Sequence, residues 1–289
     1  MLIKLKNKRA LISGGTILAV AVSITVATLL TRRNEPAIVS QIAAAAYVLI
    51  DLDAGKTLYE SEPNKSIKIG SLTKLMSVYI CFQEIEHGNI SLDDTVIISS
   101  AAVSKPGPTN NLKEGMEITL DSLLHCVLLS SGNDAITAIS VFACGDELTM
   151  VERMNRTAIE LGMSSTGYID CSGVNTFDNR STVHDLTLLV LEILEKYPQI
   201  TNYTKLREAT VESVYNGDVV ELVLHNTNVL LGTMDGVYGL KTGTAEASYN
   251  AIVLLKDGAH DLMAIVLGAP NNFIRWDSAK KLLTLGISR

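Results

Sequence analysis

Short β-type segments stand at both ends of this chain and helix-type segments fill its middle, and this order constrains the fold more than any other feature. Residues 47–51 and 56–60 flank a turn and predict a hairpin. Three β-rich runs within 237–267 predict an antiparallel meander, and a helix over 272–285 closes the chain. Between them, amphipathic patterns predict helices, one of them capped by Thr182. We therefore expect an α+β fold, an antiparallel β-sheet flanked by helices with a mainly helical subdomain.

Composition favours one main globular domain. Of the 289 residues, 47% are hydrophobic and 19% are charged, which is enough to bury a sizeable core. A net charge of -7 at pH 7 gives no electrostatic reason to bind nucleic acid, and Lys and Arg do not cluster with aromatic residues beyond the N-terminus. Nucleic acid is therefore not an expected partner.

The N-terminus has the pattern of a membrane segment. Four basic residues between positions 4 and 9 precede an uncharged apolar run from Ala10 to Leu30. As a helix rising about 1.5 Å per residue, this run can cross roughly 30 Å of hydrocarbon, and the positive-inside tendency places its N-terminal flank in the cytoplasm. We expect a cytoplasmic tip and transmembrane signal anchor at 1–33, a linker at 34–43 and an extracytoplasmic domain at 44–289.

A cleaved signal peptide is the alternative interpretation of the same segment. The apolar core of a signal peptide is usually about 7 to 15 residues long and ends near a small-x-small cleavage site. The run here is longer, and the small residues Ala43 to Ala46 lie well beyond its end. We therefore favour an uncleaved, single-pass anchor.

The cysteines and histidines show no metal-ligand spacing, so we expect no metal site and no cofactor. The five histidines lack a His-Glu-x-x-His pattern, and no Cys-x-x-Cys pair occurs among Cys81, Cys126, Cys144 and Cys171. The first three of these cysteines lie in apolar helical stretches, and we expect them as reduced core residues. A disulfide stays open as an alternative, because extracytoplasmic compartments can be oxidising.

Three short strings carry the chemistry, and their order matters more than any one of them. They are Ser71-Leu72-Thr73-Lys74, Ser131-Gly132-Asn133 and Lys241-Thr242-Gly243. Each is weak alone, since Ser278-Ala279-Lys280-Lys281 also fits the first pattern. Only the first string, however, precedes the other two and opens an apolar helical stretch. The ordered set predicts a serine acyl-transfer site.

Ser71 and Lys74 are the predicted nucleophile and base. A serine hydroxyl is a poor nucleophile near pH 7 and needs a base within hydrogen-bond reach. Positions i and i+3 share one face of a helix, so the Lys74 amine can meet the Ser71 hydroxyl. Lys74 can accept a proton only if burial and a second cation lower its pKa, and Lys241 is the candidate for that cation.

The remaining residues of the strings have predicted roles around the reacting serine. Ser131 relays a proton to the leaving nitrogen, and Asn133 orients the substrate amide. The lysine of the third string also holds an anionic substrate group, the Thr242 hydroxyl donates a hydrogen bond, and Gly243 lets the strand backbone approach closely. The backbone N–H groups of the nucleophile and of Thr244 are the expected oxyanion hole.

This set resembles the low-molecular-mass penicillin-binding proteins of the D-alanyl-D-alanine carboxypeptidase family. By this resemblance the fold is that of serine β-lactamases and penicillin-binding transpeptidases. Ser71 is then the acylated nucleophile and Lys74 its base, and Arg275 matches an arginine that binds the terminal carboxylate of the peptide. The likeness runs from about Ala44 to Arg289 and includes, besides the three strings, Ile50-Asp51, Ala54-Gly55, Leu58-Tyr59-Glu60, Leu161-Gly162-Met163 and Gly239-Leu240.

The resemblance also implies a reaction and a place in the cell. The family removes the terminal D-alanine from peptidoglycan stem peptides that end in D-Ala-D-Ala, through an acyl-enzyme that would form here at Ser71. β-lactam antibiotics would act as covalent inhibitors. The N-terminal helix would then anchor the enzyme in a bacterial cell membrane, with its catalytic domain outside the cytoplasm.

Two alternatives stay open, a β-lactamase-like hydrolase and a non-catalytic penicillin-binding sensor or scaffold. A class A β-lactamase adds a Glu-x-x-Leu-Asn segment whose Glu activates the deacylating water, and the nearest approach here, Glu212-Ser213-Val214-Tyr215-Asn216, lacks the Leu. Gly132 also stands where those enzymes carry Asp. Release of free D-alanine would distinguish an enzyme from a sensor. The strings do not separate carboxypeptidase from endopeptidase or transpeptidase activity.

Overall fold

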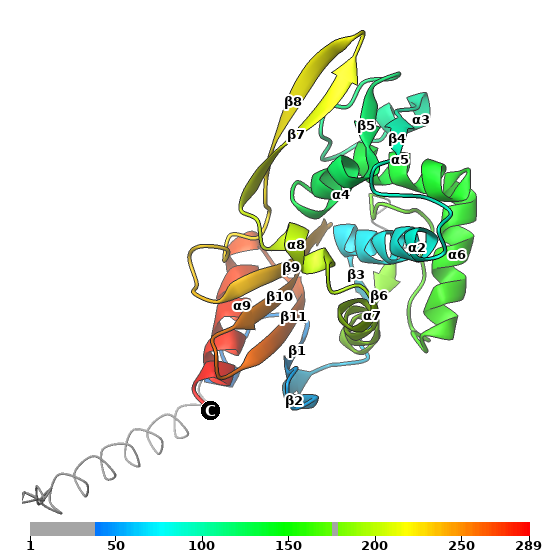
Figure 1. Ribbon diagram of the computed structural model, residues 1–289. Helices are drawn as coiled ribbons and strands as arrows, with labels where there is room; N and C mark the ends of the chain where they lie inside the picture. The colour runs from blue at the N-terminus through cyan, green and yellow to red at the C-terminus, as the bar shows by residue number, and fades with distance from the viewer. Residues whose placement is uncertain (1–37, 175–178) are drawn as a thin grey trace, which may run out of the picture.

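The main sheet of the protein has five antiparallel strands in the order β2-β1-β11-β10-β9, as Figure 1 shows. The computed structural model describes residues 38–174 and 179–289. Both the predicted hairpin and the predicted meander are confirmed. Their strands are β1 (Ala46–Asp51), β2 (Lys56–Ser61), β9 (Val237–Ala245), β10 (Ser248–Lys256) and β11 (Asp261–Ala269).

Helices cover both faces of this sheet. In Figure 1, α9 lies against one face, and α7 with the other helices lies on the opposite side. The helix expected from Ser71 begins instead as a 3-10 turn, and the α-helix proper starts at Lys74. The helices are η1 (Gly70–Thr73), α2 (Lys74–Glu86), α3 (Ser100–Val103), α4 (Leu120–Leu128), α5 (Asn133–Cys144), α6 (Glu147–Glu160), α7 (Val183–Lys196), α8 (Ile200–Thr204) and α9 (Asn272–Ile287).

The sheet separates two apolar cores. Successive side chains of a strand point to opposite faces, so Ile252 and Leu254 of β10 pack toward the helical group, whereas Val253 and Leu255 pack toward α9. β11 alternates in the same way. Because both faces are buried, these strands are continuously apolar instead of alternating with polar residues.

A second sheet has four strands in the order β4-β5-β7-β8, and its β7–β8 hairpin projects from the body of the molecule (Figure 1). Val219 and Val223 on this hairpin are 64% and 63% exposed. The β-rich run at 219–224 in the sequence indicates β8, whereas β7 has no such run, because Glu208, Thr210 and Glu212 of β7 face solvent and leave little apolar signal. The remaining strands are β4 (Thr95–Ile97), β5 (Glu117–Thr119), β7 (Glu208–Tyr215), β8 (Asp218–His225), and the short pair β3 (Ile67–Lys68) and β6 (Arg180–Ser181).

The four cysteines are free. Cys81 and Cys126 are buried in helices, as expected, whereas Cys144 at the end of α5 is only half-buried. Burial raises the pKa of Cys81 and of Cys171 to about 12, so these thiols stay protonated near neutral pH.

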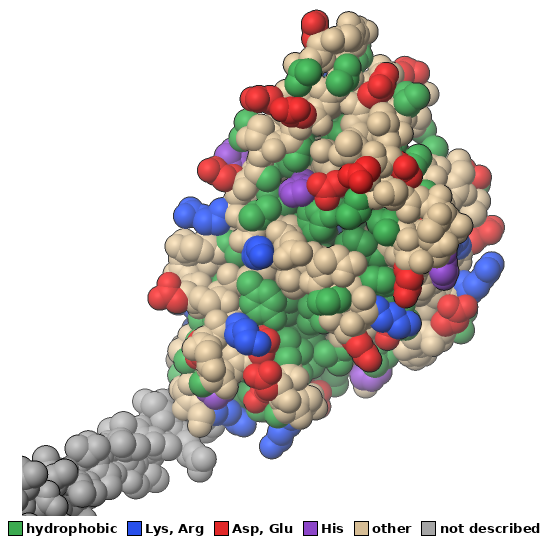
Figure 2. Space-filling model, viewed as in Figure 1, with side chains coloured by type: hydrophobic (Ala, Val, Ile, Leu, Met, Phe, Trp, Pro, Cys, Tyr) green, Lys and Arg blue, Asp and Glu red, His purple; other side chains and the backbone are tan. Residues whose placement is uncertain are grey.

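The predicted membrane anchor at 1–33 and residues 34–37 of the predicted linker lie outside the described residues, so these boundaries stay predictions. Within 38–174 and 179–289, no helix combines the length and the apolar character needed to cross a membrane. Ile42, near the end of the predicted linker, is buried in the core on the α9 side of the sheet. In the view of Figure 2, charged side chains of both signs are scattered around apolar areas over the described surface.

Thr182 caps α7 as predicted, and this contact gives a test of local stability. Its hydroxyl accepts a hydrogen bond from Asp185 N at 3.0 Å. We expect Thr182→Ala to lower the free energy of unfolding by about 1 kcal/mol, because one N–H of the first turn loses its partner. Urea unfolding measures the loss. The control is Thr187→Ala on the same helix, whose hydroxyl donates to Val183 O; equal losses in both variants would contradict the capping assignment.

Candidate active site

Ser71 and Lys74 meet at the junction of η1 and α2. In a 3-10 turn, residues i and i+3 lie above one another, which brings the two side chains together more closely than an α-helix would. The Lys74 Nζ to Ser71 Oγ distance is 2.9 Å. Lys74 is fully buried, and Ser71 lines a cleft of about 390 Å³ together with Ser131, Asn133, Thr242, Thr244 and Arg275. The structure thus brings together in one cleft six of the nine residues predicted for the site.

Two further contacts fix the orientation of the Lys74 amine. Lys74 Nζ donates to Asn133 Oδ1 and to the Ser172 carbonyl, both at 2.7 Å. Asn133 Nδ2 donates to Pro106 O at 2.6 Å, so the amide oxygen has to face the lysine. Neither carbonyl oxygen can donate a hydrogen. When Lys74 is neutral, its two N–H groups therefore go to these acceptors, and its lone pair is left to the Ser71 hydroxyl.

Burial makes a neutral Lys74 accessible near physiological pH. It lowers the pKa of Lys74 from 10.5 to about 7, against the opposing effects of the Cys171 thiol and of the Asp170 and Asp134 carboxylates. Lys241 is also fully enclosed, and burial together with the charges of Lys74 and Arg275 holds its pKa well below the ordinary value. The charge of Lys74 thus acts on Lys241, but Lys241 is not among the causes of the low pKa of Lys74, so its predicted role as the cation that lowers that pKa is not supported. Burial, however, is the main cause of the low pKa at Lys74.

Ser131 lies between the cleft and the second lysine. Lys241 Nζ donates to Ser131 Oγ at 2.8 Å and contacts Thr242 O at 3.2 Å. Ser131 has a φ of 64°, in the left-handed region that residues with side chains seldom adopt. In this turn the Asn133 N–H is held by Pro108 O at 2.8 Å. Because its oxygen accepts from Lys241, the Ser131 hydroxyl hydrogen is free to point at a group in the cleft.

Arg275 presents a positive charge to the same cleft. From the first turns of α9 it reaches Gly243 O, Thr244 Oγ1 and Asn250 O at 3.3 to 3.4 Å. Its Nε is buried without a hydrogen-bond partner, and burial lowers its pKa to about 10. No ion pair with a carboxylate is found for Arg275 within the described ranges. The arrangement suits an anionic group brought by a ligand.

Gly243 has the backbone contact that its position predicted. A Cβ at this residue would lie 2.2 Å from Ile69 O and 2.9 Å from Leu72 N. Such distances are far inside van der Waals contact, so only glycine lets β9 pass directly against η1. This crossing places the strand that holds Lys241 beside the turn that holds Ser71.

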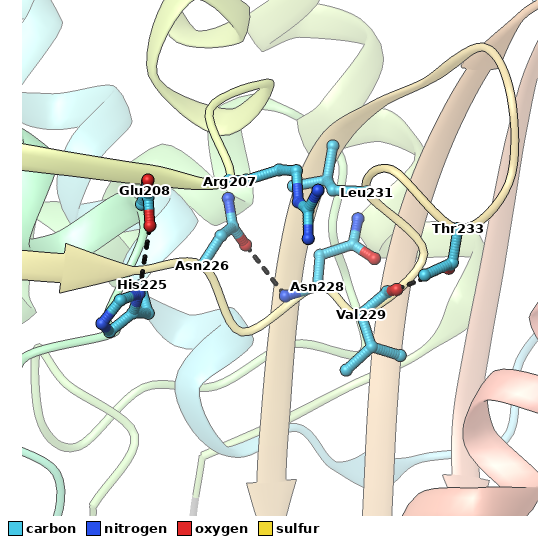
Figure 3. Close-up of a pocket in the computed structure, with 8 residues that line it drawn as sticks. All are labelled: Arg207, Glu208, His225, Asn226, Asn228, Val229, Leu231 and Thr233. Atoms are coloured by element: carbon cyan, nitrogen blue, oxygen red, sulfur yellow. Dashed lines mark hydrogen bonds and ion pairs between the residues drawn. The ribbon is translucent and has the colours of Figure 1, made fainter.

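The sequence did not single out Thr227, which also lines the cleft. Its hydroxyl lies 2.7 Å from Thr242 Oγ1. The flanking amides fix it, because Asn228 Nδ2 donates to Gly239 O and Asn226 Oδ1 accepts from Asn228 N. Figure 3 shows these two asparagines in a separate cavity of about 480 Å³ at the base of the β7–β8 hairpin, beside Arg207. The loop that carries Asn226, Thr227 and Asn228 thus lines both the cleft around Ser71 and this separate cavity. No spacing pattern in the sequence predicted this.

Two lookalike motifs lie away from the cleft. Ser278 of the second Ser-x-x-Lys string is buried in α9 with no hydrogen-bond partner for its hydroxyl, and Lys281 pairs with Asp277 at 2.7 Å. Glu212, the nearest approach to a β-lactamase glutamate, lies on the exposed face of β7 and lines a different hollow. Neither motif contributes to the site around Ser71.

Residues 31–271 match the protein family described as D-alanyl-D-alanine carboxypeptidase. The chain belongs to this family. A curated relative, D-alanyl-D-alanine carboxypeptidase DacF of Bacillus subtilis, is 33% identical over 252 residues, which make up 85% of this chain and 62% of that protein. The chain therefore spans less than two thirds of the length of this carboxypeptidase relative.

Solved structures of related proteins share the fold. The crystal structure of the Streptomyces K15 DD-transpeptidase matches with a TM-score of 0.80 at 26% identity, covering 86% of this chain and 98% of that chain. Penicillin-binding protein 6B from Escherichia coli matches with a TM-score of 0.76 at 30% identity, covering 85% of this chain and 77% of that chain. The predicted transpeptidase-type α+β fold and the family resemblance are confirmed.

The low pKa of Lys74 predicts a pH dependence of stability. Between pH 7 and 10.5 the unfolded chain binds more protons at this lysine than the folded chain does, so its contribution to stability rises with pH across that window. We expect the unfolding free energy of the wild type, minus that of Lys74→Met, to increase from pH 7 to pH 10 in urea titrations. Ser71→Ala keeps the lysine and is the control; it should retain the wild-type pH slope. A flat wild-type minus Lys74→Met difference would contradict burial of the amine.

Proposed function

We propose that this chain is a serine D-Ala-D-Ala carboxypeptidase, with Ser71, Lys74 and Ser131 as its catalytic residues. The observation that carries the proposal is the Lys74 amine, whose lone pair is left to Ser71 Oγ by two carbonyl acceptors. A general base this close, with a pKa near 7, is what a serine nucleophile needs. Family membership supports the same reaction.

Acylation follows from the contacts around Ser71. As its Oγ bonds to the carbonyl carbon of the penultimate D-alanine, its proton moves to Lys74 Nζ. The leaving nitrogen takes the Ser131 hydroxyl proton, which Lys241 Nζ replaces through its 2.8 Å hydrogen bond. The C–N bond then breaks and D-alanine leaves. We assign the backbone N–H groups of Ser71 and Thr244 to the developing oxyanion, a contribution worth about 3 kcal/mol per donor.

Deacylation returns every group to its starting state. Water attacks the ester carbon, the proton held on Lys74 goes back to Ser71 Oγ, and the proton that water gives up restores Lys241. Burial lowers the pKa of both lysines, so each can give up and regain a proton in this cleft. This step needs no carboxylate base, which fits the position of Glu212 away from the cleft.

Substrate binding completes the proposal. Arg275 and Thr244 would bind the terminal carboxylate, Thr242 and Lys241 would support it, and Asn133, which already orients Lys74, would face the substrate amide. Gly243 keeps the strand backbone close to the reacting serine. The substrate class is then a peptidoglycan stem peptide that ends in D-Ala-D-Ala, and β-lactams would acylate Ser71.

The cellular setting is also part of the proposal. We infer a single-pass anchor in residues 1–33, a linker at 34–43 and an extracytoplasmic catalytic domain from 44 onward, in a bacterial cell membrane. The basic flank and the apolar run support this topology. A substrate in the cell wall requires the cleft to lie on the outer side of that membrane.

Transfer to an amine is a second candidate outcome of the same acyl-enzyme. The match to the Streptomyces K15 DD-transpeptidase covers 98% of that chain. A protein named for transpeptidation therefore consists almost entirely of the part that this chain resembles. Adding D-amino acid or diamine acceptors to the assay separates the two outcomes. Exchange products beside free D-alanine would show transfer, whereas free D-alanine alone would show a carboxypeptidase.

Penicillin labelling tests the nucleophile. We expect the wild type to gain one penicillin mass on intact-mass analysis and Ser71→Ala to gain none, because the ester requires that hydroxyl. Ser278→Ala is the matched control, since it removes the serine of the lookalike motif and should label like the wild type. An unlabelled wild type, or a labelled Ser71→Ala, would overturn the mechanism.

Arg275 makes a distinct prediction about substrate binding. Arg275→Leu should lower kcat/KM for a peptide ending in D-Ala-D-Ala by about 10- to 100-fold, because a charged hydrogen bond to the carboxylate is lost. The same substitution should change far less for the corresponding C-terminal peptide amide, which carries no charge to bind. Equal losses on acid and amide would indicate that Arg275 only supports the fold around β9 and β10.

A further inference from the structure

The Ser172 carbonyl that holds Lys74 comes from a tightly bound loop at 170–174. This loop contributes Gly173 and Val174 to the wall of the cleft. Ser172 O accepts from Lys74 Nζ at 2.7 Å and is, with Asn133 Oδ1, one of the two acceptors that set where the lysine lone pair points. What holds the loop therefore also orients the proposed base.

One buried carboxylate gathers the loop. Asp170 Oδ1 accepts from Ser172 N at 2.7 Å, Gly173 N at 2.6 Å and Val174 N at 3.3 Å, and from Ser172 Oγ at 2.8 Å. Asp170 is only 7% exposed. Hydrogen bonds from several N–H groups to one carboxylate fix the local backbone. The loop thus winds around a negative charge.

Both ends of the loop are fastened to the segment that bears the nucleophile. Asn179 Nδ2 donates to Asp170 O and to Thr73 Oγ1, both at 3.0 Å. A Cβ at Gly173 would lie 2.0 Å from Gly70 O and 3.0 Å from Ser71 N. The loop and η1 are therefore in direct backbone contact, and a displaced loop would shift the Ser172 carbonyl relative to the lysine.

The ionisable groups around Lys74 and Lys241 come from four elements. Asp170 and the Cys171 thiol belong to the loop, and Asp134 belongs to α5. Lys241 of β9 and Arg275 of α9 bring the positive charges that act within the same cleft. Asp134 is occupied in a different task, because its carboxylate accepts the N–H groups of Asn110 and Leu112. Asp170 is thus the carboxylate that both shapes the loop and acts on the lysine.

We propose that Asp170 is a positioning residue for acyl transfer: its carboxylate holds the Ser172 carbonyl against the Lys74 amine and tunes the protonation of that amine by charge. The inference rests on the proposed function, because it assigns Lys74 as the base. Asp170 itself is not one of the residues that line the cleft around Ser71. It acts through the carbonyl and through its field.

The pH profile of acylation by benzylpenicillin separates the effect of the Asp170 charge from the effect of the loop conformation. Asp170→Asn keeps an oxygen acceptor for the loop N–H groups and removes the negative charge. Loss of the Asp170 charge disfavours the ammonium form of Lys74. The acidic limb of the pH profile, where the acylation rate falls as the pH is lowered, should therefore move to lower pH by about half a unit to one unit. Ile169→Ala is the matched control, since it removes the exposed side chain next to Asp170 without changing charge; its limb should stay at the wild-type pH.

A second variant tests the positioning itself. Asp170→Glu keeps the charge but moves the carboxylate out of register with the loop, so acylation should slow at least tenfold at every pH while the limb stays in place. The proposal is overturned if the acidic limb of the acylation rate does not move in Asp170→Asn, or if Asp170→Glu acylates at the wild-type rate. Thermal melting curves identify a variant that fails to fold. A wild type that penicillin does not label would instead overturn the proposed function, so the two failures are distinguishable.

Discussion

The hydrogen bonding of one buried amine organises the cleft. Lys74 Nζ contacts Ser71 in η1, Asn133 in α5 and the Ser172 carbonyl in a loop that follows α6. Water cannot substitute for these partners at a fully enclosed site, and a buried polar atom without a partner costs about 1 to 3 kcal/mol. Three segments that are distant in the sequence are therefore held to a common point. The base is oriented by the same contacts that make the site stable.

Direct packing of backbone on backbone supports that arrangement. Gly243 passes Ile69, and Gly173 passes Gly70, at distances that leave no room for a side chain. Main-chain atoms have no rotamers, so a contact between two backbone segments deforms less than a contact between long side chains. The N–H of Ser71 lies at this crossing. Its placement depends on the fold of three segments and on no flexible group.

The sequence predicted those features that are local in the chain and missed those that depend on distant contacts. Ser71 and Lys74 are three residues apart, so helical geometry alone brought them together, and the long apolar runs identified the sheet and its helices. Arg275 was placed by family resemblance, and it lies in the cleft. Asp170 was missed, since Asp170 with Ser172 and Gly173 predicts a turn but does not predict which distant residues that turn contacts. Thr227 was missed because its only signal was a pair of flanking asparagines.

The two cores on either side of the main sheet have a consequence for how related enzymes can diverge. Ser71 and Lys74, the proposed nucleophile and base, belong to the helical side, whereas Arg275 is carried by α9 on the other side. Substitutions in one core repack that side as a unit and leave its own reactive groups in their mutual geometry. What changes is the offset between the two sides, which sets the distance from Ser71 Oγ to the Arg275 guanidinium. The fold can thus alter the distance between Ser71 and Arg275 without disturbing the contact of Ser71 with Lys74.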